Sequence, residues 1–421
     1  MRTIKPSTLT GEITILPSKS YVHRILIAAA FADGVTEVVA ETSADDVHKT
    51  AGCLRALGCG IEYENGAFKV SGGMKSGKET VTMDCGESGT TYRFMVPIVA
   101  ALGRNCEFKV AGKLGERPMS DLLGCLTDNG MKIDNTSPLR ISGKIASGDF
   151  RISGKVSSQY ISGLLLALPS LDGDSKIIID GKIASIDYVN ITLDVLKQFG
   201  IKIERTDYGF FVPGKQTFKS PGRIVAESDW SNAAFFLAAG AISGDLTVKG
   251  LNMDSVQGDK AIMDVLQDCG ADFKVTPDGI SIKTSNLKGS QLDALHTPDM
   301  VPIASVIAAN AKGETVIMNI ERLRDKESDR LQATLEIMSA LGVEAKTDGF
   351  TLWISGRTDI LPSSIPIISG HNDHRIVMAS AIAGLKTELS VTDPHAVKKS
   401  YPNFWEEYIR LGGVQNENIK P

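Results

Sequence analysis

The stretch YVNITLDVLKQFG, residues 188–200, shows the unit from which the fold is built. Val189, Leu193, Leu196 and Phe199 recur at the spacing of one helix face, and Gly200 supplies the left-handed residue with which many helices end. The same ending recurs as RALG, TDNG, QDCG, SALG and IRLG. The six glycines lie 72, 70, 70, 72 and 70 residues apart: Gly58, Gly130, Gly200, Gly270, Gly342 and Gly412. The sequence therefore predicts six copies of one unit.

A second marker has the same period. Short runs with the composition of β-strands follow six further glycines, which are 69, 70, 71, 69 and 71 residues apart: Gly34, Gly103, Gly173, Gly244, Gly313 and Gly384. Each unit is expected to contain a helix, a strand, an amphipathic helix and hairpin-like strands such as 209–212 and 349–354. The predicted fold class is α/β.

The helix before each of these strands is apolar on nearly every side and rich in alanine. A helix that is hydrophobic all round is buried. The six predicted buried helices are 23–31, 93–102, 161–168, 233–241, 301–311 and 376–385. Six units divide into three and three, and 421 residues exceed what one core usually organises. We therefore expect two domains, each with three buried helices.

The composition excludes several classes of protein. A net charge of −5 argues against nucleic acid or an anionic membrane surface as the partner, although a local basic site could still bind small anions. The N-terminus lacks the apolar segment of a signal peptide, and no apolar run approaches the ~20 residues of a membrane span. A cytoplasmic protein is expected. The six cysteines show no metal-binding spacing and are expected to be reduced and mostly buried.

Equivalent polar positions lie at the start of the buried helices. They are 70, 69, 71, 70 and 74 residues apart: Lys19, Gly89, Ser158, Asp229, Asp299 and Asp373. A helix N-terminus offers unpaired N–H donors and a partial positive charge, which suit phosphate or carboxylate. Each Ser or Asp could instead only cap its helix. The seven basic residues nearby favour an anion site: Lys19, Arg24, Arg93, Arg117, Arg330, Arg375 and Lys399.

Eight short motifs, in order along the chain, resemble those of one family. They are PSKSYVHR (17–24), SGTTYRF (88–94), GERP (115–118), SSQY (157–160), PDM (298–300), KESDR (326–330), NDHR (372–375) and KKSYPNF (398–404). Each motif is weak alone, but together they run from Lys19 to Lys399 with the spacing of the repeat. The chain is similar to the 5-enolpyruvylshikimate-3-phosphate synthases (3-phosphoshikimate 1-carboxyvinyltransferases), which are enolpyruvyl transferases.

The resemblance implies a two-domain fold of six βαβαββ repeats, three per domain, in which each domain is an inside-out α/β barrel and the two domains close on the substrates. In this family the N-terminal strand belongs with the C-terminal half. One domain would then comprise residues 1–17 and 228–421, with the phosphoenolpyruvate-binding and catalytic residues. The other, residues 18–227, would hold most contacts to shikimate 3-phosphate.

The resemblance also implies the reaction. The family transfers the enolpyruvyl (carboxyvinyl) group of phosphoenolpyruvate to the 5-hydroxyl of shikimate 3-phosphate by addition and elimination, in chorismate and aromatic amino acid biosynthesis. Phosphate leaves without cleavage of its P–O bond. No cofactor and no metal are expected, the chain is expected to be a monomer, and glyphosate is expected to compete with phosphoenolpyruvate.

The family's contacts map onto residues of this chain. Those to shikimate 3-phosphate are Lys19, Ser20, Arg24, Ser157, Ser158, Gln159, Ser185, Asp299, Arg322 and Lys326, with Tyr188 near the shikimate ring. Those to phosphoenolpyruvate are Lys19, Gly89, Arg117, Gln159, Arg330, Arg375 and Lys399. Glu327 is expected to pass the proton of the methylene carbon and Asp299 that of the hydroxyl, with Lys19 able to share this work. Glu327 could instead only stabilise a helix N-terminus.

Three residues depart from the family's pattern: Glu87 and Arg322 stand where Asn is frequent, and Phe94 where Pro is frequent. Two other functions stay open. A sister enzyme transfers enolpyruvyl to UDP-N-acetylglucosamine, but it has a functional Cys where Gly112 stands here. A non-catalytic sensor of anions would not need the carboxylates Asp299 and Glu327. A metal at His371 and His374 would lack an evident third ligand.

Overall fold

The structure is a computed structural model that describes residues 1–42, 44–74, 77, 79–356 and 364–417. The chain forms two compact units. Unit 1 consists of Met1–Leu16 and Glu227–Pro421, and unit 2 consists of Pro17–Ala226. Each unit has its own hydrophobic core.

All the sheets follow one plan. The strands of the described residues form six sheets of four strands. In each sheet two neighbouring strands are parallel, and the other two continue it in antiparallel fashion. In four sheets a buried helix connects the two parallel strands, because parallel neighbours need a crossover connection. In the other two sheets the parallel partners are exchanged: residues 9–14 pair with residues 244–249, and residues 223–225 pair with residues 35–39. The resulting order of strand, helix, strand, helix, strand, strand is the predicted repeat.

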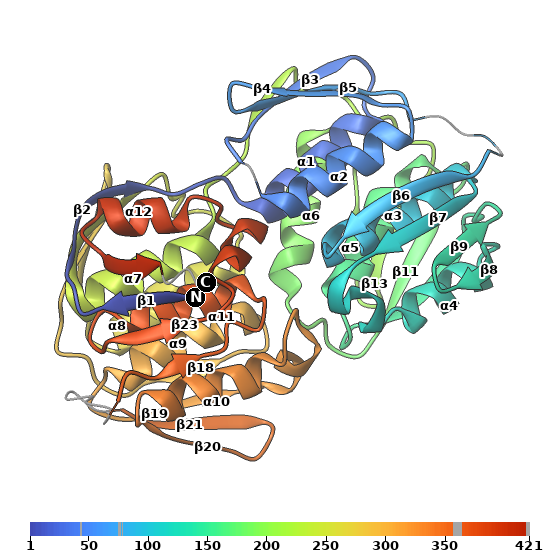
Figure 1. The fold of residues 1–421 in the computed structure, drawn as a ribbon. Coiled ribbons are helices and arrows are strands. Elements are labelled where there is room, and N and C mark those ends of the chain that lie inside the picture. Colours follow the sequence, from blue (N-terminus) through green and yellow to red (C-terminus); the bar gives the residue numbers. More distant parts are fainter. Residues whose placement is uncertain (43, 75–76, 78, 357–363, 418–421) are drawn as a thin grey trace. The chain divides into compact units, whose positions relative to one another are not determined.

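Unit 2 contains three of these sheets around the helices α1 (Lys19–Phe31), α3 (Gly89–Leu102) and α5 (Ser158–Ala167). Figure 1 shows α1 and α2 (Asp45–Ala56) packed beneath β3, β4 and β5. The outer helices also include α4 (Ser120–Asp128) and α6 (Ile186–Gln198). The sheets are β14 (Arg223–Val225), β3 (Val35–Val39), β5 (Ala67–Ser71), β4 (Gly60–Glu64); β6 (Val81–Gly86), β7 (Cys106–Val110), β9 (Leu139–Ser142), β8 (Lys132–Thr136); and β10 (Asp149–Ser153), β11 (Ser175–Asp180), β13 (Gly209–Val212), β12 (Glu204–Thr206).

Unit 1 repeats this arrangement around α7 (Trp230–Ser243), α9 (Val301–Ala309) and α11 (His374–Ala383). Its outer helices are α8 (Ile262–Asp268), α10 (Arg330–Ala340) and α12 (Phe404–Arg410). The sheets are β16 (Asp272–Thr276), β17 (Gly279–Lys283), β15 (Gly244–Lys249), β2 (Leu9–Thr14); β18 (Gln291–Asp293), β19 (Gly313–Met318), β21 (Thr351–Gly356), β20 (Glu344–Thr347); and β22 (Ile367–Ile368), β23 (Leu389–Val391), β1 (Arg2–Lys5), β24 (Val414–Glu417). The terminal strands β1 and β24 pair, so the two chain ends lie side by side (Figure 1).

The six buried helices exist as predicted, but most begin earlier than the apolar pattern does. Every residue of α7 and of α9 is buried. Helix α1 begins at Lys19 and α3 at Gly89, four residues before the predicted starts. The N–H groups of the first helical turn have no acceptor within the helix, and polar side chains or ligands can bind them. Polar residues are therefore suited to this turn. Most of the polar segments singled out in the sequence are therefore caps and first turns of the buried helices, whereas Pro298–Met300 forms a 3-10 helix before α9.

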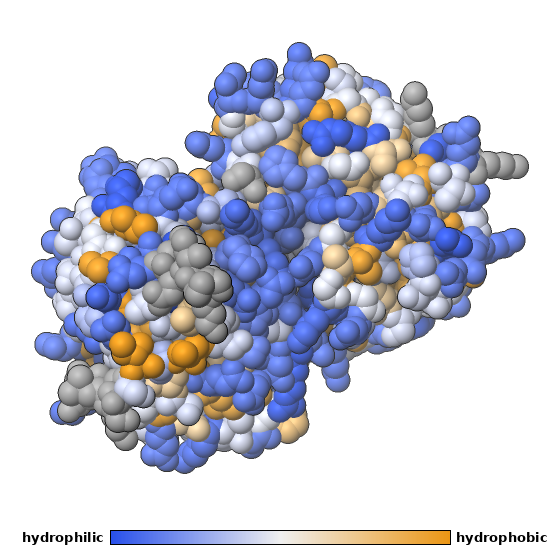
Figure 2. All heavy atoms as spheres, in the orientation of Figure 1, coloured by the Kyte–Doolittle hydropathy of each residue, from blue (hydrophilic) through white to orange (hydrophobic). Residues whose placement is uncertain are grey.

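The cysteines, the helices and the surface side chains have the properties of an ordinary globular protein. All six cysteines are buried with free thiols. Among the described residues no helix has both the length and the apolar character needed to cross a membrane. On the face seen in Figure 2, hydrophobic side chains lie in small separate groups within a hydrophilic surface.

Candidate active site

The N-terminus of α1 presents Lys19. The Lys19 ammonium lies 3.1 Å from Asp46 Oδ2, and both side chains are 17% exposed. Asp46 belongs to the first turn of α2. It was not among the predicted site residues, because an acidic residue in the first turn of a helix is usually explained by the helix dipole. The pair of acidic residues at 45 and 46 was the available signal.

The N-terminus of α3 lies against two arginines. A Cβ added to Gly89 would lie 2.8 Å from Arg117 Nη1 and 3.5 Å from Arg93 Nη1. Ser88 caps this helix, because its Oγ accepts a hydrogen bond from the N–H of Thr91 at 3.2 Å. The absence of a side chain at Gly89 therefore leaves room for a guanidinium beside the positive end of a helix. This is suitable geometry for an anion.

Gln159 connects this helix end to α5. Its Nε2 donates to Thr90 Oγ1 at 2.8 Å, and its Oε1 accepts from Arg93 Nη1 at 2.7 Å. Ser157 caps α5 by accepting from the N–H of Gln159 at 3.3 Å. Ser158 is 4% exposed, and its hydroxyl makes no hydrogen bond within the part of the chain that the structure describes. Arg93 was named among the basic residues but not as a site residue.

Arg24 uses most of its hydrogen-bond donors within the protein, so fewer remain for a ligand than its predicted role suggests. Four of its N–H groups donate to neutral oxygens: Thr192 Oγ1, Ser20 O, Ser162 Oγ and Tyr188 O. The Phe94 ring lies 4.9 Å from the guanidinium carbon, which gives a physical role to one departure from the family pattern. Burial lowers the pKa of Arg24 to about 9. A buried cation with neutral partners favours a nearby anion, but only one of its five N–H groups remains to bind it.

Ser185 lies at the start of α6. It is 2% exposed and adopts a left-handed conformation with φ of 55°. Tyr188 follows in the first turn of the same helix, and its carbonyl binds Arg24. Ser20, Arg24 and Tyr188 thus belong to one hydrogen-bonded group in unit 2, and the N–H of Tyr188 connects it to the carbonyl of Ser185 at 3.2 Å. Non-glycine residues with positive φ are uncommon and concentrate at functional sites.

The site residues of unit 1 gather around Arg330, which is 1% exposed at the start of α10. Its Nη1 donates to Asp299 Oδ1 at 2.6 Å, its Nη2 to Glu327 Oε2 at 2.6 Å and its Nε to Asp373 Oδ2 at 2.8 Å. Burial disfavours the charge of Arg330, but these carboxylates outweigh it and raise its pKa. The carboxylate side chains differ in exposure: 27% for Glu327, 16% for Asp299 and 0% for Asp373. Only the first two can meet a ligand, and Asp373 orients the arginine.

Asp299 lies among three cations. Lys326 Nζ is 3.0 Å from its Oδ1, and Arg375 Nη2 is 3.4 Å from its Oδ2. Burial alone would raise the pKa of Asp299, but Lys326, Arg375 and Arg330 hold it well below the usual value. Burial lowers the pKa of Lys326 to about 8, against the attraction of Asp299. Asp299 is therefore ionised at neutral pH and can accept a proton.

Asp259 is a further buried carboxylate near this group, and the sequence did not indicate it. It is 6% exposed in the short 3-10 helix Gly258–Ala261. Burial raises its pKa to about 6, which the charge of Arg375 opposes and that of Asp299 reinforces. Because the charged neighbours Arg375 and Asp299 lie on two other repeats, no local pattern links them to Asp259.

The remaining predicted residues of unit 1 lie in the loops around these helices. Lys399 ends a 3-10 helix, and its Nζ donates to the carbonyl of Asn372 at 2.7 Å. Arg322 lies in the 3-10 helix Glu321–Asp325, and its charge contributes to the lowered pKa of Lys326. His371 Nε2 is 2.6 Å from Glu336 Oε2, whereas His374 is buried. Within the described residues no group of three or more His, Cys, Asp or Glu side chains is arranged to hold a metal ion.

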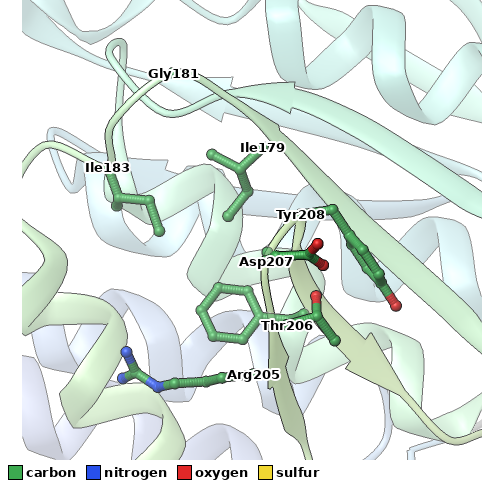
Figure 3. A pocket seen from close by; sticks show the side chains of 9 residues that line it. Ile179, Gly181, Ile183, Arg205, Thr206, Asp207 and Tyr208 are labelled. Atoms are coloured by element: carbon green, nitrogen blue, oxygen red, sulfur yellow. The ribbon is translucent and has the colours of Figure 1, made fainter.

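Glu87 directly precedes Ser88, the cap of α3, and its carboxyl group lies against Gly112. A Cβ at Gly112 would lie 2.9 Å from Glu87 Cδ, and Gly112 has φ of 54°, so a cysteine there would be both crowded and strained. A pocket of about 200 Å³ lies beside the turn between β12 and β13 and is lined by Ile179, Ile183, Phe210 and neighbours. Its lining side chains are drawn in Figure 3. None of the predicted site residues lines this pocket.

Comparisons with known proteins agree with the motifs. Residues 4–408 match the model of the family described as EPSP synthase (3-phosphoshikimate 1-carboxyvinyltransferase). The 3-phosphoshikimate 1-carboxyvinyltransferases of Clostridium novyi and Clostridium beijerinckii are 40% and 39% identical, with 98% of this chain and 98% of each relative covered.

Solved structures share the fold. The EPSP synthase of Acinetobacter baumannii matches with a TM-score of 0.81 at 25% identity, over 99% of each chain. The enolpyruvyl transferase NikO from Streptomyces tendae matches with a TM-score of 0.80 at 16% identity, over 100% of this chain and 99% of that one, which supports the fold alone. The predicted fold class and family are confirmed, and the chain belongs to the EPSP synthase (3-phosphoshikimate 1-carboxyvinyltransferase) family.

Proposed function

We propose that this chain transfers the enolpyruvyl group of phosphoenolpyruvate to the 5-hydroxyl of shikimate 3-phosphate through the residues at the starts of its buried helices. The family's activity is that of a 3-phosphoshikimate 1-carboxyvinyltransferase, in the shikimate pathway of aromatic amino acid biosynthesis. The observation that carries the assignment of residues is the buried Arg330 with two accessible carboxylates, Asp299 and Glu327. Binding of an anion alone would not require carboxylates beside its arginine.

The addition and the elimination each require two proton transfers. In the addition, the 5-hydroxyl oxygen bonds to C2 of phosphoenolpyruvate, its proton leaves, and the methylene carbon gains a proton. In the elimination, the bond between C2 and the phosphate oxygen breaks, the new methyl group loses a proton, and the departing phosphate gains one. Asp299, which is held ionised, accepts the hydroxyl proton, and Glu327 passes the carbon proton. In this proposal Lys19 can share these transfers.

The proposal divides substrate binding by chemistry. For phosphoenolpyruvate it assigns Lys19, Gly89, Arg117, Gln159, Arg330, Arg375 and Lys399, because an anion with two acidic groups needs several cations and guanidinium groups match such oxygens. For shikimate 3-phosphate it assigns Lys19, Ser20, Arg24, Ser157, Ser158, Gln159, Ser185, Asp299, Arg322 and Lys326. We further propose that the chain acts as a monomer in the cytoplasm.

The direct test measures phosphate release. The wild-type chain is expected to release phosphate only when phosphoenolpyruvate and shikimate 3-phosphate are both present. Release with UDP-N-acetylglucosamine in place of shikimate 3-phosphate would support the sister activity instead. Binding of both anions without release would support a sensor.

Ser158→Ala is expected to weaken shikimate 3-phosphate binding by about 1–3 kcal/mol, the scale of a hydrogen bond to a charged group. The reason is that the Ser158 hydroxyl is nearly buried and has no bond to a described residue. Calorimetric titration would measure this affinity and, separately, that for phosphoenolpyruvate, which should change much less. Ser170→Ala is the control, because Ser170 Oγ bonds to Ala167 O at the far end of α5. Equal losses for both ligands would show that the assignment of Ser158 is wrong.

Gly89→Ala is expected to raise the KM for phosphoenolpyruvate by about 10- to 100-fold, the loss of one charge-assisted hydrogen bond. The new methyl group would lie 2.8 Å from Arg117 Nη1 and displace that guanidinium. Folding should survive, because the clash is with the end of a flexible side chain. Gly124→Ala, in the open middle of α4, is the matched control and should leave kinetics unchanged. An unchanged KM in Gly89→Ala would remove Gly89 and Arg117 from the phosphoenolpyruvate site.

A further inference from the structure

A chain of hydrogen bonds crosses the interior of unit 2. His23 Nδ1 lies 2.7 Å from Thr50 Oγ1, which lies 2.7 Å from Thr91 Oγ1, and Thr91 Oγ1 donates to Ser88 Oγ at 2.8 Å. All four residues are at most 1% exposed. They come from α1, α2, α3 and the cap of α3. Buried polar groups are costly without partners, so this chain strongly favours one arrangement of the three helices.

The hydrogen bonds of this network all point in one direction, from His23 toward Thr91. Burial, and then the charges of Lys19 and Arg24, lower the pKa of His23 well below its usual value, so the imidazole is neutral. Its Nε2 has no hydrogen-bond partner among the described residues. An unpaired buried N–H is rarer than an unpaired acceptor, so the ring proton belongs on Nδ1, where it donates to Thr50. Thr50 then donates to Thr91, and Thr91 donates onward.

Thr91 is the branch point of this network. Besides Thr50 and Ser88, its Oγ1 lies 3.3 Å from the backbone carbonyl oxygen of Asp46. The carboxylate of Asp46 holds the Lys19 ammonium at 3.1 Å. Ser88, in turn, caps the helix that begins at Gly89. One buried hydroxyl therefore joins the residue that holds Lys19 to the residue that forms the N-terminus of α3.

We propose that Thr91 is a positioning residue that fixes Lys19, through Asp46, relative to the N-terminal turn of α3 and so sets the geometry of the phosphoenolpyruvate site. The inference rests on the roles proposed for Lys19 and Gly89. Thr91 itself is buried and touches no substrate in this mechanism. Without its hydroxyl, the Asp46 carbonyl and Ser88 Oγ lose the one donor that they share, and the Thr50 hydroxyl loses its acceptor, so α2 and α3 are no longer held in one register. An anion bound by both Lys19 and α3 is then bound less tightly.

The test is Thr91→Val, which keeps the shape of the side chain and removes the hydroxyl. The KM for phosphoenolpyruvate is expected to rise about tenfold, the scale of one buried hydrogen bond. The value of kcat and the KM for shikimate 3-phosphate should change by less than about threefold, as expected when ground-state and transition-state binding of one substrate fall together. Thr91→Ser keeps the hydroxyl and should restore most of the phosphoenolpyruvate KM. A residue with only a structural role would change the fraction of folded enzyme without this split between substrates.

Thr334→Val is the matched control. Thr334 is 0% exposed in α10, and its hydroxyl has no hydrogen-bond partner among the described residues, so the same substitution there breaks no bond. Its kinetics should equal those of the wild type. If Thr91→Val does not fold, Thr50→Val interrupts the same chain one step earlier and should still raise the phosphoenolpyruvate KM about threefold.

Three outcomes would overturn the inference: a wild-type phosphoenolpyruvate KM in Thr91→Val or, if that variant does not fold, in Thr50→Val; equal increases in KM for both substrates; or no recovery in Thr91→Ser. Failure of the proposed function would look different. In that case the wild type would release no phosphate, or Gly89→Ala would leave the phosphoenolpyruvate KM unchanged.

Discussion

Glu327→Gln is expected to lower kcat by about 10²–10⁴-fold, the usual contribution of a positioned acid or base. Glutamine keeps the size of the side chain and can still accept from Arg330 Nη2, which lies 2.6 Å from Glu327 Oε2. It cannot give or take a proton. Because the side chain keeps its size and its bond to Arg330, substrate binding should stay near normal. Phosphate release measures turnover, and exchange of solvent deuterium into the methylene group of phosphoenolpyruvate should fall in parallel because it reports the same proton step.

Glu336→Gln provides the control for this variant. Glu336 is on the same helix, but its partner is His371, outside the group around Arg330. Its turnover should equal that of the wild type. If Glu327→Gln keeps near-normal turnover and exchange, Glu327 only stabilises the start of α10, and the proton must come from another group, with Lys19 the first to test.

Arg330→Met is expected to destabilise the protein by about 3–5 kcal/mol at pH 7, because it removes the cation shared by buried carboxylates. Asp373 would keep Ser328, 3.0 Å away, and the N–H of Arg375 as donors, but it would lose its charged partner at 0% exposure. Urea unfolding monitored by circular dichroism measures the loss. Arg410→Met is the control: Arg410 is 52% exposed, so its substitution should cost less than about 0.5 kcal/mol.

The deficit of Arg330→Met should shrink as the pH falls. In the wild type the pKa values of Asp299 and Asp373 are below their ordinary values, because Arg330 and its neighbours outweigh burial. Depressed carboxylate pKa values stabilise the fold above the pKa of the unfolded chain, and this stabilisation is lost as the pH falls through the folded-state values. Without Arg330 the buried carboxylates bind protons more readily, so the variant gains relative to the wild type as the pH falls from 7 through the ordinary aspartate pKa of about 4. A deficit independent of pH would contradict this account of the cluster.

The repeat and its buried helices could be predicted because each depends on local chemistry. Gly200 ends its helix in a left-handed conformation, with φ of 77°, and α7 is apolar on all sides because every one of its residues is buried. The pairing of distant strands could not be predicted locally. Strand β2 lies parallel to β15, with Leu9 opposite Gly244, and nothing near Leu9 indicates that partner.

The basic residues of the proposed site could be identified from the sequence, but the carboxylates that pair with them could not. Lys19 and Arg330 stand out as basic residues at helix starts, but their carboxylates Asp46 and Asp373 are fixed by contacts between elements. In the sequence, Asp373 stands out only as one of the six equivalent polar positions of the repeat. The commitment of Arg24 to four neutral oxygens also depends on tertiary packing, so its sequence motif overstated how much of it a ligand could reach.

In the proposed reaction, enolpyruvyl transfer proceeds by cleavage of the C–O bond of phosphoenolpyruvate. Phosphoenolpyruvate labelled with ¹⁸O at the oxygen that bridges carbon and phosphorus, incubated with the wild-type chain and shikimate 3-phosphate, tests it most directly. Mass spectrometry of the products is expected to find the label in inorganic phosphate, released one for one with 5-enolpyruvylshikimate 3-phosphate and only when shikimate 3-phosphate is present. Unlabelled phosphate would mean that the P–O bond breaks, and release without shikimate 3-phosphate would mean hydrolysis; either result would contradict the account.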